Sequence, residues 1–195
     1  MSHQDWFGAV SVALAATGYT SYIVGILKKR TKPHLFSWGV WAIIMTIVFV
    51  AQFIKGAGAG AWVTGFSAAA CLTIAALAIQ HGEKNITTSD WLAFFGAITI
   101  IPVWYLTRDP LWAVLLATVI DAMAYYPTFR KSYGKPYEEN TLTYSIDVIK
   151  WVVAFFALGN YSATTLIYPM FCLSANTLLV VMILWRRSKM LTPVS

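Results

Sequence analysis

The chain has 195 residues, of which 58% are hydrophobic and only 11% are charged. Soluble domains carry about 25% charged residues, so this composition excludes an ordinary soluble protein and indicates a polytopic membrane protein. A membrane-spanning helix needs about 20 residues, and the length therefore accommodates about six or seven spans but no separate soluble domain.

Seven apolar runs are separated by charged, Gly-rich or Pro-rich breaks, and each run predicts a transmembrane helix. The runs cover residues 6–27, 35–54, 61–80, 91–106, 111–129, 143–158 and 164–185. The fourth and sixth are short, and the break from Arg108 to Pro110 is tight, so a count of six is the alternative. A basic cluster follows the first run instead of preceding it, which favours a retained span over a signal peptide.

The Lys and Arg residues fall almost entirely on one side of these spans. With seven spans, one side receives Lys55 and Arg108, and the other receives Lys28, Lys29, Arg30, Lys32, Lys84, Arg130, Lys131, Lys135, Arg186, Arg187 and Lys189. The positive-inside rule then predicts an outside N-terminus and a cytoplasmic C-terminus in the plasma membrane. The net charge of +6 is explained by this topology and by contact with the lipid bilayer, so we expect no nucleic-acid partner.

The first three runs and the last three share a weak internal repeat. Residues 22–33 align with 125–136, Ser37 aligns with Ser145, and Cys71 aligns with Cys172. Two three-helix units run parallel only when an extra helix joins them. The predicted fold is therefore all-α with seven transmembrane helices in a 3+1+3 layout: a first repeat over 1–80, a linker over 81–110, a second repeat over 111–189 and a tail over 190–195.

This layout resembles the SWEET and PQ-loop superfamily of seven-helix transporters, of which the chain would be an outlying member. The family's Pro-Gln and basic turn are matched by Pro127, Arg130 and Lys131, with Thr128 in place of Gln. An asparagine of the family's seventh helix is matched by Asn176. The resemblance implies transport by alternating access, with Pro127 as a hinge and Asn176 at the substrate site.

Three ionisable residues lie inside the predicted spans: Asp121, Asp147 and Lys150. A charge at the bilayer centre costs about 2.5 to 3.5 kcal/mol, so each needs a partner. Lys150 can pair with Asp147 on its own helix face or with Asp121 on the neighbouring helix. One reading is an ion pair that fixes helix packing. The other follows from the count of two carboxylates and one ammonium, because the remaining carboxylate must be protonated or hold a cationic solute or a coupling proton.

Helical periodicity adds the predicted lining of a pocket. Tyr125 lies one turn from Asp121, Tyr22 is its equivalent in the first repeat, and Trp151 follows Lys150. The predicted substrate-binding set is thus Asn176, Asp121, Lys150, Trp151, Tyr125 and Tyr22, and the candidates for proton coupling are Asp121 and Asp147. The spans contain no metal-ligand spacing and no catalytic histidine arrangement, so we expect no enzyme, no metal and no cofactor.

The leading functional hypothesis is a carrier for a small polar solute, either a passive uniporter or coupled to protons. The alternative is a receptor on the same fold, similar to the KDEL receptor, which binds its ligand without transport. A receptor of that kind predicts basic residues clustered in the cavity, and here only Lys150 lies inside a span. The expected partners are a small-molecule substrate, the bilayer and protons; the sequence leaves open a homo-oligomer.

Overall fold

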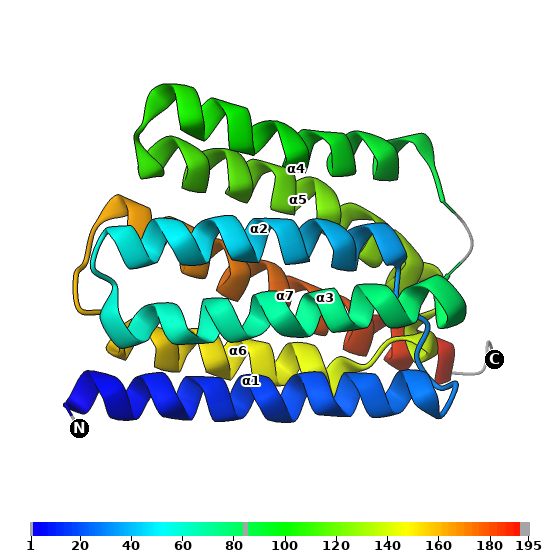
Figure 1. Cartoon of the computed structure of the whole chain (residues 1–195). Coiled ribbons are helices and arrows are strands. Elements are labelled where there is room, and N and C mark those ends of the chain that lie inside the picture. Colours follow the sequence, from blue (N-terminus) through cyan, green and yellow to red (C-terminus); the bar gives the residue numbers. More distant parts are fainter. Residues whose placement is uncertain (1, 84–85, 192–195) are drawn as a thin grey trace.

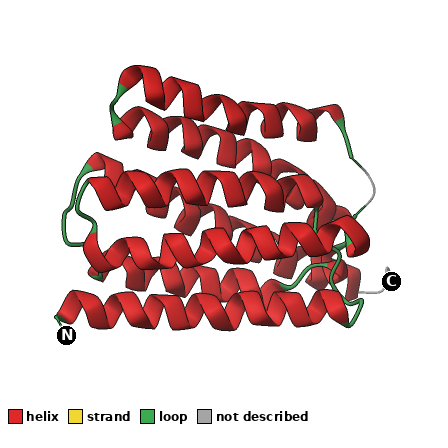
Figure 2. Cartoon of the chain, viewed as in Figure 1, coloured by secondary structure: helices red, strands yellow, loops and turns green. Residues whose placement is uncertain are grey.

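The computed structural model describes residues 2–83 and 86–191. In this part of the chain all regular structure is helical and no strand occurs (Figure 2), as predicted. The elements are α1 (His3–Leu27), α2 (Leu35–Ile54), η1 (Gly58–Ala61), α3 (Trp62–His81), α4 (Thr88–Thr107), α5 (Pro110–Gly134), η2 (Pro136–Glu138), α6 (Thr141–Phe156) and α7 (Ala163–Leu191).

Six of these helices are long and apolar enough to cross a membrane, in agreement with a multi-pass membrane protein. They are α1, α2, α3 with its 3-10 extension, α4, α5 and α7. The exception is α6, whose 16 residues make a helix about 24 Å long, shorter than a hydrocarbon core of about 30 Å.

The break between α4 and α5 is a true helix–helix turn. Arg108 ends α4 in the left-handed conformation, with φ 54. The Asp109 side chain caps α5 by accepting a hydrogen bond from the Leu111 amide, and Pro110 occupies the first turn of that helix. Proline has no amide proton to lose there and its fixed φ suits a helix start. Two residues thus reverse the chain, and α4 and α5 lie antiparallel (Figure 1).

The helices form one bundle with their axes roughly aligned (Figure 1). In the first half of the chain α3 packs against both α1 and α2; in the second half α7 packs against both α5 and α6. The two halves meet where α1 packs on α6 and α2 packs on α5. At one edge of the bundle, α4 packs against α5 and α2 (Figure 1).

The two ends of the bundle differ in charge. The last turns of α1, α3, α5 and α7 lie at one end of the bundle, and the first turn of α1 lies at the other end (Figure 1). We call the first of these the basic end, since it carries the residues predicted to be cytoplasmic: Lys28, Lys29, Arg30, Lys32, Arg130, Lys131, Lys135, Arg186, Arg187 and Lys189. Lys84 falls outside the described residues. Lys55 and Arg108 lie at the opposite end.

Buried polar contacts tie the helices together at the basic end. The Lys131 ammonium of α5 pairs with Glu139 at 2.9 Å and donates to the backbone carbonyl of Lys32. Both side chains of the ion pair are at most 5% exposed. Asp90 of α4 lies 3.4 Å from the His34 ring that caps α2. These contacts link three helices and two loops and so hold the basic end of the bundle together.

Candidate solute-binding site

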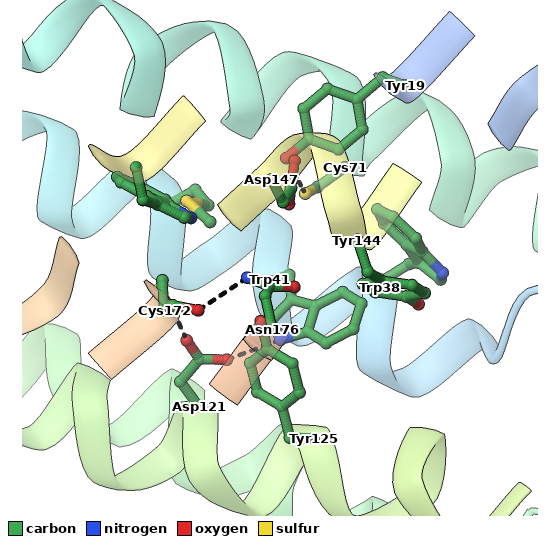
Figure 3. A pocket seen from close by; sticks show the side chains of 12 residues that line it. Tyr19, Trp38, Trp41, Cys71, Asp121, Tyr125, Tyr144, Asp147, Cys172 and Asn176 are labelled. Carbon is green, nitrogen blue, oxygen red and sulfur yellow. Dashed lines mark hydrogen bonds between the residues drawn. The ribbon is translucent and has the colours of Figure 1, made fainter. Parts of the chain in front are cut away.

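Inside the bundle, side chains from both halves enclose a cavity of about 20 Å³. They come from α1, α2, α3, α5, α6 and α7 (Figure 3): Tyr19, Trp38, Trp41, Met45, Cys71, Asp121, Tyr125, Tyr144, Asp147, Trp151, Cys172 and Asn176. Half of the lining residues are aromatic, and two are carboxylates. A space of this volume holds about one water molecule, so a larger molecule fits only after the lining side chains move apart.

Asp121 lies on one side of the cavity, together with Tyr125, Cys172 and Asn176 (Figure 3). Its carboxylate accepts a hydrogen bond of 2.6 Å from the Trp41 indole and a longer one of 3.8 Å from the Cys172 thiol. Only 1% of the residue is exposed. Within the described residues Asp121 makes no ion pair. Its hydrogen-bond donors are neutral, so no neighbouring positive charge balances an ionised Asp121.

Asp147 lies on the other side of the cavity, together with Tyr19 and Cys71 (Figure 3). The Lys150 ammonium pairs with Asp147 at 2.8 Å, one turn along the same helix, and is fully buried. The same ammonium lies 5.0 Å from the centroid of the Tyr19 ring and 4.9 Å from that of Trp151. Of the two pairings left open by the sequence, the structure has the one within α6.

Asn176 presents an acceptor to the cavity. Its amide nitrogen donates 2.8 Å to the carbonyl of Cys172, one turn earlier in α7. Its oxygen is buried and has no hydrogen-bond partner among the described residues. An unsatisfied buried acceptor is costly. Because the only hydrogen bond of this amide stays within its own helix, Asn176 does not join helices, and the free oxygen is available to an N–H or O–H of a bound molecule.

Five of the predicted residues line this one cavity: Asp121, Tyr125, Asp147, Trp151 and Asn176. They come from α5, α6 and α7, and the cavity brings them together. Lys150 does not line it; the lysine lies beside it and is held by Asp147, Tyr19 and Trp151. The predicted residues are therefore close together in space. Both carboxylates line the cavity, and Lys150 lies behind the lining.

Two other predicted residues lie nearby. Tyr22 is fully buried but does not line the cavity; its ring packs against Trp38 at a centroid distance of 4.7 Å, and its hydroxyl accepts from the indole of Trp38 at 3.3 Å. Pro127 is a buried residue within α5, which continues to Gly134. A hinge at Pro127 remains a prediction.

The sequence reasoning missed part of the aromatic wall, namely Tyr19, Trp38 and Tyr144, and also Met45. A usable signal was present in the spacing. The lining residues of α2 are Trp38, Trp41 and Met45, and those of α6 are Tyr144, Asp147 and Trp151. Both sets have the same helical spacing of three and then four residues, so they occupy one face of each helix. The amino acids differ between the sets, which is why a search for identical letters did not align them.

Comparison of the chain with protein-family models, curated proteins and solved structures gave no match.

Proposed function

We propose that this protein is a seven-helix transporter in which two three-helix units rock around the central cavity and carry a small polar solute across the membrane. We also propose that it is an outlying member of the SWEET and PQ-loop superfamily. The observation that carries the transport proposal is the correspondence between the two halves of the cavity lining.

The buried faces of the two halves repeat in register. All seven buried residues of α1 lie 106 positions before buried residues of α5, and all five buried residues of α6 lie 106 positions after buried residues of α2. All seven buried residues of α3 lie 101 positions before buried residues of α7. Burial therefore supports a parallel repeat, with α4 as the linker.

This register differs from the alignment by sequence letters. The letters placed Tyr22 on Tyr125 and Ser37 on Ser145, whereas burial pairs Tyr19 with Tyr125 and Ser37 with Thr143. The offset of 106 is the same on both sides of the connector at the basic end, so the letter matches at offsets of 103 and 108 do not follow the packing. Buried faces are fixed by helix packing; they keep the offset of 106 over two helix pairs and change to 101 only for α3 and α7.

The cavity itself follows the same register. Ten of its twelve lining residues form five corresponding pairs: Tyr19 and Tyr125, Trp38 and Tyr144, Trp41 and Asp147, Met45 and Trp151, and Cys71 and Cys172. The other two, Asp121 and Asn176, correspond to Ala15 and Ala75. A site at the interface of two repeats is the usual place for a transporter substrate.

The two helix–helix interfaces between the halves, α2 with α5 and α6 with α1, are also equivalent. The Ser37 hydroxyl of α2 donates 2.9 Å to the carbonyl of Ala124 in α5, and the Thr143 hydroxyl of α6 donates 2.9 Å to the carbonyl of Gly18 in α1. These bonds are related by the same offset. Equivalent interfaces on both sides of the cavity allow one half to rotate against the other about a shared axis, which is the motion that alternating access requires.

The repeat also supports seven spans in the predicted orientation. In this register α6 is the counterpart of α2, which is long enough to cross a membrane. The short α6 lies between α1 and α7 and packs against both, so bundle contacts compensate for its length. The positive-inside rule then makes the basic end cytoplasmic.

Polar contacts join the helices at both ends of the bundle, and in this proposal the structure represents the occluded state of the carrier. At the basic end these are the Lys131 and Asp90 contacts described above. At the opposite end the Gly159 amide donates 3.1 Å to the Ala57 carbonyl, and the Gln4 side chain donates to the Leu158 carbonyl. A solute therefore reaches the cavity only when one set of contacts opens.

Solute counterflow in proteoliposomes tests the proposal. Vesicles containing the full chain are loaded with unlabelled glucose, alanine, thiamine, uridine or choline, and accumulation of the same labelled solute is measured. We expect one class to accumulate, and Asn176→Ala to lower its accumulation at least about fivefold, since one lost hydrogen bond to a buried group costs about 1–3 kcal/mol. The matched control is Asn160→Ala in the exposed α6–α7 loop, which should leave accumulation unchanged.

Two outcomes would contradict transport by this site. Equal accumulation in wild type and Asn176→Ala would remove the cavity from the pathway. Stabilisation of the purified protein by a solute that never accumulates would favour the receptor function instead. For proton coupling, uptake under an imposed pH gradient is compared between wild type and Asp121→Asn; unchanged dependence on the gradient would remove Asp121 from that role.

A further inference from the structure

The wall of the cavity already holds one ammonium group. The Lys150 ammonium contacts a carboxylate oxygen of Asp147 at 2.8 Å and faces the rings of Tyr19 and Trp151 at 5.0 Å and 4.9 Å. A carboxylate combined with aromatic faces is the arrangement by which proteins recognise ammonium groups away from water. This side of the cavity is therefore a complete ammonium site whose occupant belongs to the protein.

The opposite side has the same components without a lysine. Asp121 provides the carboxylate, Tyr125 and Trp41 provide rings whose centroids are 5.1 Å apart, and Trp38 packs edge-on to Trp41 at 4.9 Å. In the repeat register the counterpart of Lys150 is Ile44, a buried hydrophobic residue. The repeat therefore supplies an ammonium to one side of the cavity and none to the other.

We infer that the cavity binds a small organic monocation, with its ammonium group against Asp121 and its alkyl groups against Trp41 and Tyr125. The inference rests on the proposed function, because it names the class of solute carried by the same site. The Asn176 oxygen, which has no partner among the described residues, accepts a hydrogen bond from a hydroxyl or N–H of that solute.

The charges around the cavity argue against other solutes. A neutral solute would require Asp121 to be protonated, because an ionised carboxylate buried there has no compensating charge; a monocation supplies that charge itself. An amino acid would bring a carboxylate, but Lys150, the one cation beside the lining within the described residues, is held at 2.8 Å by Asp147.

Choline binding to the full chain tests this inference. Binding of tritiated choline to the purified protein is measured by scintillation proximity, with two competitors. One is the neutral carbon analogue, in which a tert-butyl group replaces trimethylammonium; the other is betaine, which carries a carboxylate. We expect unlabelled choline to compete and both analogues to compete at least about a hundredfold less well, because only choline offers Asp121 an unbalanced positive charge.

Variants on both groups of the site sharpen the test. Asp121→Asn should weaken choline binding on the order of a hundredfold. The matched control is Asp109→Asn: Asp109 caps α5 away from the cavity, asparagine can still cap the helix, and this variant should bind choline as the wild type does. Tyr125→Phe keeps the ring and should bind normally, and Tyr125→Leu should lose about tenfold. The tyrosine variants keep the test decisive if Asp121→Asn fails to fold.

The outcomes separate this inference from the proposed function. Equal competition by the neutral analogue, or full choline binding by folded Asp121→Asn or by Tyr125→Leu, would overturn the monocation inference. Accumulation of glucose in counterflow without choline binding would overturn it and leave transport standing. Choline binding that depends on Asp121 without any accumulation would uphold the monocation site and overturn transport.

Discussion

The buried pair of Asp147 and Lys150 should behave as one energetic unit. Lys150→Met removes the ammonium and leaves a carboxylate that is only 13% exposed; Asp147→Asn leaves an ammonium that is 0% exposed. Breaking a buried pair by removing one partner costs about 3–5 kcal/mol. We therefore expect each single variant to lose about that much stability. The double variant should recover at least half of the loss, because no uncompensated charge remains.

Thermal unfolding in detergent micelles measures these losses through the fluorescence of the nine tryptophans. For a chain of this size 1 kcal/mol shifts the melting temperature by roughly 2–4 °C, so each single variant should melt about 6 to 20 °C below wild type. The matched control is the exposed pair of Lys32 and Glu138, at 3.1 Å with side chains 50% and 32% exposed. Lys32→Met should cost at most about 1 kcal/mol.

The double-variant cycle decides whether the reasoning holds. If the losses of Lys150→Met and Asp147→Asn simply add to within about 0.5 kcal/mol in the double variant, the two residues are not coupled. The 2.8 Å contact would then contribute nothing, and the account of Lys150 as an internally neutralised ammonium would be wrong. A loss from Lys32→Met as large as that from Lys150→Met would contradict the role given to burial.

Two further predictions concern packing and topology. A Cβ at Gly60 would lie 2.7 Å from the Leu158 side chain and 3.1 Å from its Cα, so Gly60→Ala should cost about 1–3 kcal/mol in thermal unfolding. The control is Gly39→Ala, where the added Cβ meets open space and should be neutral or stabilising. Similar losses at both sites would refute this packing. Since both native cysteines are buried, a membrane-impermeant maleimide added to intact cells should label Lys55→Cys but not Lys28→Cys, and the reverse pattern would invert the proposed orientation.

Much of the fold could be predicted from sequence because apolar runs and their breaks are strong signals. The predicted run 35–54 coincides with α2. Other helices continue beyond their apolar runs for reasons that hydropathy does not register. The capping box of Ser2 and Asp5 starts α1 at His3, and α5 continues to Gly134, past Lys131 with its ion pair to Glu139.

The site could be predicted only in part. Charges inside apolar runs are rare enough to be conspicuous, so Asp121, Asp147 and Lys150 could be found from sequence. Which carboxylate pairs with Lys150 could not be predicted, because the spacing is compatible with either Asp121 or Asp147. The choice depends on which aromatic rings surround the ammonium group in the packed bundle. Aromatic residues such as Tyr19 are common in membrane helices, so their place in the wall becomes evident only when the helices are packed.

The two halves of the cavity have corresponding helices and buried positions, but their polar side chains differ. This difference can be tested by substitution. Ala15 and Ala75 are the counterparts of Asp121 and Asn176, and both are buried. The Asn176 amide nitrogen donates to a carbonyl of its own helix, and the nitrogen of Ala75→Asn would find the equivalent carbonyl of Cys71. Ala15→Asp would instead face Asp147, which occupies the position corresponding to the Trp41 donor.

We therefore expect the two substitutions to differ strongly. Ala75→Asn should cost about 1–3 kcal/mol, because its nitrogen is satisfied and only its neutral oxygen lacks a partner. Ala15→Asp should cost about 3 kcal/mol or more in thermal unfolding, because it buries a second carboxylate against Asp147. Lys150→Met should not relieve Ala15→Asp, since it leaves two carboxylates without any cation. If Ala15→Asp were instead the milder of the two, the register that pairs Ala15 with Asp121 would be wrong, and with it the equivalence of the two halves.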